Sequence, residues 1–166
     1  MMLILCFVMN LSMGLQEVSL QEVRQLYKEA ETSEEATETL LGQLEEADEA
    51  EPVLLAYRAS GTMLMAKHVS NPFSKMGYFK KGKNMMQQAV DAAPGNAEIR
   101  FLRFALQSST PAFLGYKDNM EEDKAFLLRE LPKLKNKELE QLILPFLINS
   151  DYLTEKEKQL LRPAGK

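Results

Sequence analysis

Apolar side chains recur at helical spacing along most of this chain. A first stripe is formed by Val18, Val23, Leu26, Tyr27 and Ala30, and a second by Ala36, Leu40, Leu41, Leu44 and Ala47. Residues three or four positions apart share one face of an α-helix, so these stripes are typical of amphipathic helices. No segment alternates polar and apolar residues over a length that would predict a β-strand. The pattern therefore predicts an all-α fold.

Start and stop signals divide the chain into seven to eight helices. Thr32 and Glu35 have the spacing of a capping box, and Pro52 suits the first position of a helix. A stop is expected at Asn71-Pro72, followed by a helix over about 73–92 that ends at Pro94-Gly95 and a loop over 108–116. Pro145 should kink or end its helix. The expected N-caps are Asn96, Asp118 or Asn119, and Asn136, and Thr154 and Glu157 have the spacing of another capping box.

The first fifteen residues carry no charged side chain and are mostly apolar. Ser12 and Gly14 then supply the small residues that precede a signal-peptidase cut. We therefore expect a signal peptide over residues 1–14, a mature chain that begins at Leu15, and a single all-α domain over 15–166. The protein would then be exported, either periplasmic or secreted. The alternative is that this segment forms a buried N-terminal core helix.

Composition narrows the classes of site that the chain can carry. Its 166 residues correspond to one domain of ordinary size. A single cysteine, Cys6, excludes an intramolecular disulfide and a cysteine-based zinc site, and a single histidine, His68, excludes sites built from several histidines. The pI of about 5.2 argues against a general nucleic-acid binder. We predict no metal, no cofactor and no specific nucleic-acid partner.

Charged residues are segregated along the chain. Residues 17–51 have a net charge of −10, residues 58–103 a net charge of +6, and residues 104–166 are balanced. Our preferred interpretation is that the acidic helices pack beside the basic ones, so that the two fields partly cancel. The alternative is that each block is a separate docking surface for a charged partner.

One stretch of the chain resembles a tetratricopeptide repeat. Gly82, Met86, Ala89 and Pro94 reproduce the small–large–small–proline spacing of the second helix of such a repeat, and Ala66, Val69, Ser70 and Phe73 take first-helix positions. The resemblance implies stacked antiparallel helical hairpins, and the alternative is an irregular helical bundle. Residues 71–107 also resemble segments of small uncharacterised exported proteins of the Bacteroidota, a likeness that implies no activity.

Residues 66–83 concentrate the polar chemistry of the chain. Basic side chains alternate there with aromatic ones around the turn at Asn71-Pro72, a combination that can hold an anionic ligand, single-stranded nucleic acid or an acidic peptide. The candidate ligand-binding residues are Lys67, His68, Asn71, Lys75, Tyr78, Lys80 and Lys81. The structural alternative is that Phe73, Met76 and Phe79 follow helical spacing and belong to the core. Gly77 and Gly82 lie inside the predicted helix, which suggests close helix packing at both.

Three classes of function remain after these exclusions. The leading hypothesis is an exported, non-catalytic helical module that binds a peptide or protein partner, because helical-hairpin arrays expose extended surfaces. The second is a periplasmic enzyme that acts on an anionic substrate near His68 and Tyr78, although the sequence assigns no catalytic residue. The third is a protein that contacts an anionic membrane surface through its lysines.

Overall fold

A computed structural model describes residues 18–45 and 51–162 of the chain. Those residues form eight α-helices and two short 3-10 helices, with no β-strand among them, so the predicted all-α class is confirmed. The elements are α1 (Leu20–Ala30), α2 (Glu34–Gln43), α3 (Pro52–His68), α4 (Pro72–Ala92), α5 (Ala97–Ser109), η1 (Ala112–Leu114), α6 (Met120–Glu130), η2 (Leu131–Lys133), α7 (Lys137–Asn149) and α8 (Glu155–Leu161). The predicted signal peptide and its cleavage site lie outside the described residues.

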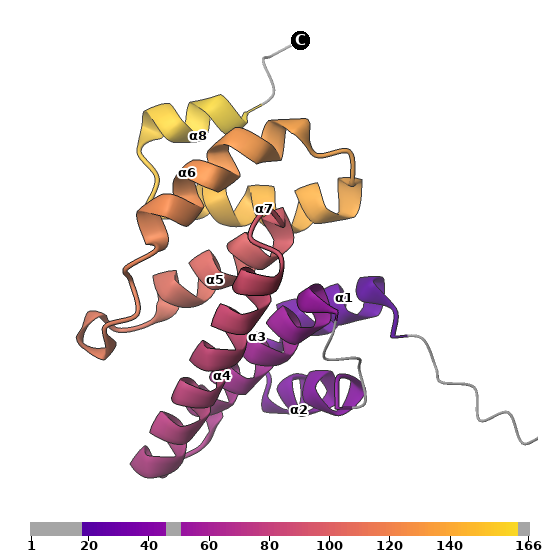
Figure 1. The fold of residues 1–166 in the computed structure, drawn as a ribbon, viewed down its shortest axis with the longest axis vertical. Helices are drawn as coiled ribbons and strands as arrows, with labels where there is room; N and C mark the ends of the chain where they lie inside the picture. Colours follow the sequence, from indigo (N-terminus) through magenta and orange to yellow (C-terminus); the bar gives the residue numbers. More distant parts are fainter. Residues whose placement is uncertain (1–17, 46–50, 163–166) are drawn as a thin grey trace, which may run out of the picture.

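Helices α3 and α4 form a long antiparallel hairpin through the middle of the molecule (Figure 1). Gly82 allows the two helices to approach, because a Cβ atom there would lie 2.7 Å from the carbonyl oxygen of Ala59 and would also collide with Met63. Gly77 has no neighbour within 4 Å of such an atom. The predicted close packing is therefore confirmed at Gly82 and wrong at Gly77.

The remaining helices pack around this hairpin. Helices α1 and α2 lie against α3, α5 lies against both α3 and α4, and α6 to α8 gather at the far end of α5 (Figure 1). The core is continuous across all of them, and its largest fully buried apolar side chains include Tyr57, Leu40, Leu44, Met86, Ile99, Leu102, Phe104, Leu127, Ile143 and Leu147. Met86 and Ala89 are both fully buried, as the tetratricopeptide register requires. The relationship to that family itself stays a prediction.

Two expected boundaries are wrong. Ser33, and not Thr32, caps α2, since its hydroxyl oxygen accepts a hydrogen bond of 3.2 Å from the backbone N–H of Ala36. Thr32 still belongs to the turn that ends α1, where its backbone N–H donates to Glu29. The expected loop over 108–116 is partly helical, because α5 continues to Ser109 and η1 follows. Of the kink or end expected at Pro145, the end does not occur, because α7 continues to Asn149.

Asn119 precedes α6 as expected, but its side chain makes no capping hydrogen bond. The remaining caps agree with the sequence. Asn71, Asn96 and Asn136 each accept hydrogen bonds from the first turn of the helix that follows, and Thr154 and Glu157 form the predicted capping box. Pro52 and Pro72 occupy first-turn positions, where a missing N–H costs nothing. Local chemistry at these sites therefore sets where the helices begin.

A buried ion pair joins the acidic block to the basic one. Arg24 of α1 donates from Nε and Nη2 to the two carboxylate oxygens of Glu98 in α5, both at 2.8 Å, and the hydroxyl of Tyr57 donates to the same carboxylate at 2.6 Å. The acidic helices do lie beside α3. In this buried pair, however, the base comes from the acidic block and the acid from the basic block, so the net charges of the blocks do not explain it.

Candidate functional site

An apolar groove of about 540 Å³ lies between the α3–α4 hairpin and the end of α5 with η1. Its lining is mainly aliphatic, aromatic and thioether side chains, and its only charged lining residues are Lys67 and Lys75. The apolar groove is formed by Met63, Leu64, Ala66, Lys67, Pro72, Lys75, Met76, Phe79, Leu106, Ser109, Thr110, Pro111, Phe113 and Leu114. A mostly apolar concavity with a few polar groups is the usual form of a small-molecule site.

The first turns of α4 supply one wall of the groove. Pro72, Lys75, Met76 and Phe79 follow the three- and four-residue spacing that places side chains on one helix face. Asn71 fixes where this helix begins, because its Oδ1 accepts hydrogen bonds from the N–H groups of Phe73 at 2.8 Å and Ser74 at 3.3 Å. Asn71 therefore positions the wall and satisfies the N–H groups that an anion would otherwise bind.

The opposite wall is the segment from the end of α5 through η1. Gly115 ends η1 with a φ of +60°, a left-handed conformation that favours glycine. The next residue, Tyr116, packs edge-on against Phe79 with ring centroids 5.7 Å apart. Lys83 of α4 donates to the carbonyl oxygen of Gly115 at 3.5 Å and lies over the Tyr116 ring. These contacts hold η1 beside α4 and limit the length of the groove.

Two apolar residues of the groove lining, Met76 and Phe113, are exposed, and so is Phe73, which neighbours the lining residue Pro72. Phe73 is 88% exposed, Phe113 is 86% exposed and Met76 is 39% exposed. They are half of the six exposed large hydrophobic residues in the described part of the chain. Single exposed apolar residues are normal on a protein surface, but a group of them at one concavity marks an interaction site. The expectation that Phe73, Met76 and Phe79 belong to the core is therefore wrong for Phe73 and Met76, which are exposed, and confirmed for Phe79, which is buried.

The hairpin that carries the groove is basic over most of its length, and Asp91, near the end of α4, is the one acidic residue in its two helices. Residues 52–90 contain no aspartate or glutamate, but they contain Arg58, Lys67, Lys75, Lys80, Lys81 and Lys83. The acidic helix α2 lies on the other face of α3, where Gly61 touches Leu41 and His68 touches Thr37. Met63 is two residues from Gly61, about 200° around the helix, so it points away from that face, and Lys67 is one residue, about 100°, from His68. The charged residues of the groove lining are therefore basic, and α2 lies on a different face of α3.

The structure separates the candidate residues that the sequence grouped. Lys67 and Lys75 line the groove, Asn71 caps α4, and Lys80 and Lys81 are exposed on α4, with Lys81 on a side shared with Arg58. His68 is half-buried with its Nε2 3.4 Å from the hydroxyl oxygen of Thr37, which is itself fully buried. Tyr78 is half-buried and outside the groove lining. Only two of the seven candidates thus meet in one concavity.

Sequence reasoning missed the second wall of the groove. Pro111 and Phe113 lie in the expected loop over 108–116, and Leu106 lies just before it; the sequence nominated none of the three as a site residue. The one available signal was Phe113 itself, a large aromatic residue in a short turn bracketed by Pro111 and Gly115.

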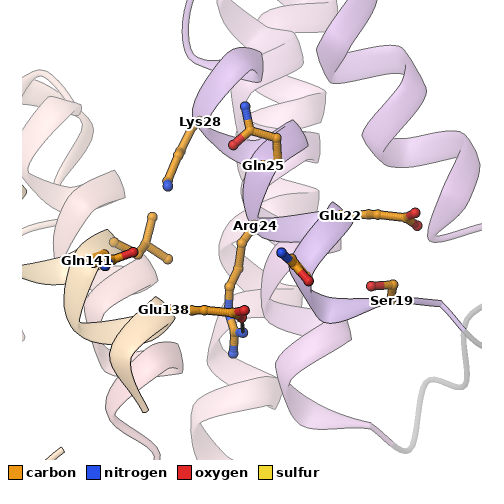
Figure 2. A pocket seen from close by; sticks show the side chains of 9 residues that line it. Ser19, Glu22, Arg24, Gln25, Lys28, Glu138 and Gln141 are labelled. Atoms are coloured by element: carbon orange, nitrogen blue, oxygen red, sulfur yellow. Dashed lines mark hydrogen bonds and ion pairs between the residues drawn. The ribbon is translucent and has the colours of Figure 1, made fainter.

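A second, polar cleft of about 500 Å³ lies between α1 and α7 (Figure 2). Arg24 reaches across it to Glu138, with Nη1 3.2 Å from Oε2, while Lys28 and Gln141 face each other nearer its rim (Figure 2). The lining mixes both signs of charge, and the Arg24 guanidinium is bound mainly to Glu98. The lining of this cleft therefore favours neither anions nor apolar ligands, unlike the lining of the apolar groove.

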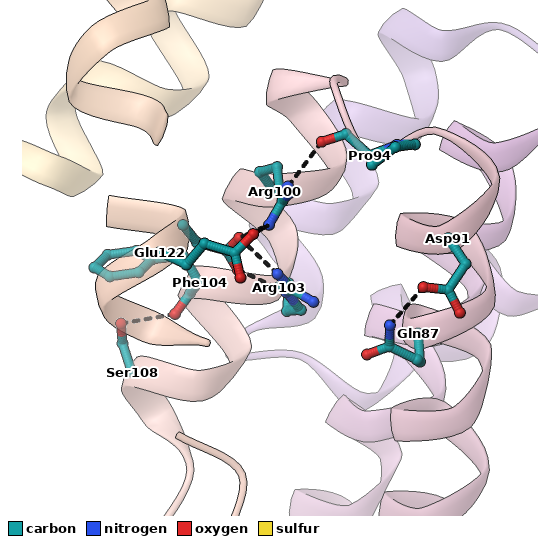
Figure 3. A network of polar contacts seen from close by, with 9 residues as sticks. Gln87, Asp91, Pro94, Arg100, Arg103, Phe104, Ser108 and Glu122 are labelled. Atoms are coloured by element: carbon teal, nitrogen blue, oxygen red, sulfur yellow. Dashed lines mark hydrogen bonds and ion pairs between the residues drawn. The ribbon is translucent and has the colours of Figure 1, made fainter. Parts of the chain in front are cut away.

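A third polar cluster joins α5 to α6 (Figure 3). Asp123 is fully buried and accepts hydrogen bonds of 2.6–2.7 Å from Arg100 and Arg103. Arg100 also binds the carbonyl oxygen of Pro94 and the carboxylate of Glu122, and its hydrogen bond lowers the pKa of Glu122. Because these donors and acceptors are occupied by one another, the cluster holds two helices together.

Three tyrosines are buried among these elements. Burial is the main cause that raises the pKa of Tyr27, Tyr57 and Tyr116 above the ordinary tyrosine value. The Tyr116 hydroxyl and the side-chain amide of Gln107 have no hydrogen-bond partner among the described residues. Burial therefore favours the neutral, protonated form of all three tyrosines in the folded protein.

The described residues hold no group of three or more His, Cys, Asp or Glu side chains placed to bind a metal ion. No helix among the same residues has the length and hydropathy to span a membrane. No family model, curated protein or solved structure matches this chain.

Proposed function

We propose that this protein binds an anionic amphiphile, a molecule with one hydrocarbon chain and a carboxylate or phosphate head group. The apolar groove would take the chain, and Lys67 and Lys75 would meet the head group. The observation that carries the proposal is the lining of the groove, in which apolar side chains are combined with charged residues of positive sign alone.

The size of the groove suits such a ligand. Its volume of about 540 Å³ lies in the range of small-molecule sites. Burying a hydrocarbon chain against Leu106, Met76 and Phe79 would gain roughly 25 cal/mol for each Å² of apolar surface removed from water. The head group would add a charge-assisted contact that discriminates between anions and cations more than it adds affinity.

A peptide or protein partner was the leading expectation from the sequence. The contacts of Phe79 with Tyr116 and of Lys83 with Gly115 join α4 to the segment after η1. A helical peptide needs a groove that continues past such a point, since its anchors extend over several turns. The short groove thus favours a single hydrocarbon chain. Export of the protein remains part of the proposal, as a prediction from residues 1–14.

The test is calorimetric titration with two amphiphiles of equal chain length, each below its micelle concentration. We expect dodecyl phosphate to bind at one site, and dodecyltrimethylammonium to bind at least about tenfold more weakly because of its charge. The double substitution Lys67→Glu with Lys75→Glu should remove this preference. Lys156→Glu, an exposed lysine on α8, is the matched control and should leave it unchanged.

Equal affinity for the two head groups would contradict the proposal, and so would loss of the preference in Lys156→Glu. A leucine-rich acidic peptide that binds while dodecyl phosphate does not would instead support the peptide hypothesis. Because all variants share the same N-terminal residues, any contribution of the apolar segment 1–14 cancels in the comparison.

A further inference from the structure

The two most exposed phenylalanines in the described part of the chain lie at the same end of the molecule. Phe73 belongs to the first turn of α4 and Phe113 to η1, and the apolar groove lies between these two elements. At 88% and 86% exposure, both rings project from the surface with almost no cover. An exposed ring loses the free energy that its burial would provide, so two of them at one end indicate a binding surface.

Helix geometry adds further residues to this end. Phe73 and Lys80 are seven positions apart and share a face of α4, and Met76 lies between them at the edge of the groove. We call Phe73, Met76, Lys80 and Phe113 the tip surface. Its apolar members project outward, and its lysine lies one to two turns back along the helix.

The charge around the tip surface has one sign. Lys67, Lys75, Lys80 and Lys81 are all exposed, and no acidic residue occurs between positions 52 and 90. On the other side of the groove, the first acidic residue after η1 is Asp118, which lies beyond Tyr116. The acidic helix α2 packs on the opposite face of α3. On the hairpin itself, the charged side chains that adjoin the tip surface are therefore lysines.

We infer that the tip surface docks on an anionic membrane, with Phe73 and Phe113 inserted at the boundary of head groups and acyl chains. Aromatic and aliphatic side chains of peripheral proteins enter this boundary to a depth of about 5–10 Å. Lysines near an anionic leaflet each contribute about 1 kcal/mol, and the attraction decays within a Debye length. The projecting rings match the apolar boundary of the leaflet, and the surrounding lysines match its anionic head groups.

The position of the groove agrees with this orientation. Phe113 and Met76 belong both to the tip surface and to the groove lining, so the groove opens at the end that would touch the membrane. A membrane surface is also a source of anionic amphiphiles. The inference nevertheless rests on the exposed rings and lysines, and it does not require the proposed groove ligand.

The experiment is co-sedimentation of the full chain with vesicles of phosphatidylcholine alone and of phosphatidylcholine mixed with phosphatidylglycerol. We expect binding to the mixed vesicles that weakens as salt is added. The double substitution Phe73→Ser with Phe113→Ser should reduce the partition coefficient at least about tenfold. Leu160→Ser, on α8, removes another exposed apolar side chain and should have no such effect.

Charge reversal gives a second, independent readout. Lys80→Glu with Lys81→Glu should lower binding to the mixed vesicles at least about tenfold, whereas Lys156→Glu should not. Circular dichroism of each variant establishes that the helices are intact. Equal binding of wild-type and both double variants would overturn the inference, and so would an absence of binding by the wild-type protein.

The two proposals can fail separately. Phe73 is outside the groove lining, so Phe73→Ser should lose vesicle binding and keep its titration with dodecyl phosphate. A protein that titrates with dodecyl phosphate but never binds vesicles refutes membrane docking alone. A protein that binds vesicles through Phe73 but does not bind dodecyl phosphate refutes the groove ligand and supports membrane docking.

Discussion

The guanidinium of Arg24 and the carboxylate of Glu98 form two parallel hydrogen bonds of 2.8 Å, although 74 positions separate them in the chain. Both residues are buried, and the hydrogen bond to Glu98 is the main cause that raises the pKa of Arg24 above its ordinary value. Tyr57 donates to the same carboxylate at 2.6 Å. One carboxylate of α5 therefore ties together α1 and α3.

Removal of one member of this cluster should destabilise the fold strongly. Arg24→Met leaves the Glu98 carboxylate buried without its cation, and we expect a loss of about 3–5 kcal/mol in the free energy of unfolding. Tyr57→Phe removes one hydrogen bond to a charged group and should cost about 1.5–3 kcal/mol. Chemical denaturation measures both. Arg129→Met, at an exposed ion pair, is the control, and an equal effect there would contradict this account.

Two adjacent carboxylates on α6 offer a matched comparison. Asp123 is fully buried between Arg100 and Arg103, whereas the side chain of Glu122 is 59% exposed although it also binds Arg100. Asp123→Asn should cost about 3–5 kcal/mol because two buried arginines lose their anion. Glu122→Gln should cost less than about 1 kcal/mol, as exposed ion pairs do. Denaturant midpoints that fall equally in the two variants would show that burial does not decide the effect.

The two glycines of α4 should respond to alanine in opposite directions. Gly77→Ala adds a methyl group into open space on a helix and should stabilise the protein by about 0.5–1 kcal/mol. Gly82→Ala forces that group against the Ala59 carbonyl and Met63, so overpacking should cost about 1–3 kcal/mol. Thermal melts of the two variants and the wild type show whether each substitution raises or lowers the melting temperature. Stabilisation by Gly82→Ala would mean that α3 and α4 are farther apart than described.

Alkaline pH should unfold the protein through its buried tyrosines. Tyr27, Tyr57 and Tyr116 have folded-state pKa values above the ordinary value of about 10, so the unfolded state releases their protons first. The stabilisation that these tyrosines provide is fully present below pH of about 10. Above that pH, the free energy of unfolding falls by about 1.4 kcal/mol per pH unit for each of them, until the pH reaches the folded-state pKa.

Phenolate absorbance and circular dichroism measured together check this pH dependence. The ionisation of the three buried tyrosines should coincide with the loss of helix, and Tyr116→Phe should make the loss of stability less steep. Titration of all five tyrosines with a midpoint at pH of about 10, while the helices stay intact, would contradict the burial of these three.

Helix boundaries were largely predictable because they depend on neighbours in the sequence. Asn96, Asn136 and the Thr154–Glu157 pair cap their helices as expected, since each satisfies N–H groups two or three residues away. The error at Thr32 has the same origin, because two adjacent hydroxyl residues compete for one cap. Gly77 and Gly82 could not be distinguished, since the difference depends on which face of α4 meets α3.

The candidate site was predictable only on one side. The lysines and aromatic residues around Asn71-Pro72 were visible in the sequence, and Lys67 and Lys75 do line the groove. Phe113 comes from a segment about 40 positions away, and only tertiary packing brings it to that hairpin. The pairing of Arg24 with Glu98 was equally unpredictable from the sequence. The net charges of the two blocks suggested that the acidic block would supply the acid and the basic block the base.

Methionine methyl groups provide the most direct test of the groove. Met63 and Met76 line it, whereas Met120 is buried in α6 and does not. In a titration of methyl-labelled protein with dodecyl phosphate, we predict saturable changes in the NMR signals of Met63 and Met76 and none at Met120. Signals that stay unchanged at Met63 and Met76, or that shift equally at all three residues, would contradict the assignment of this groove as the binding site.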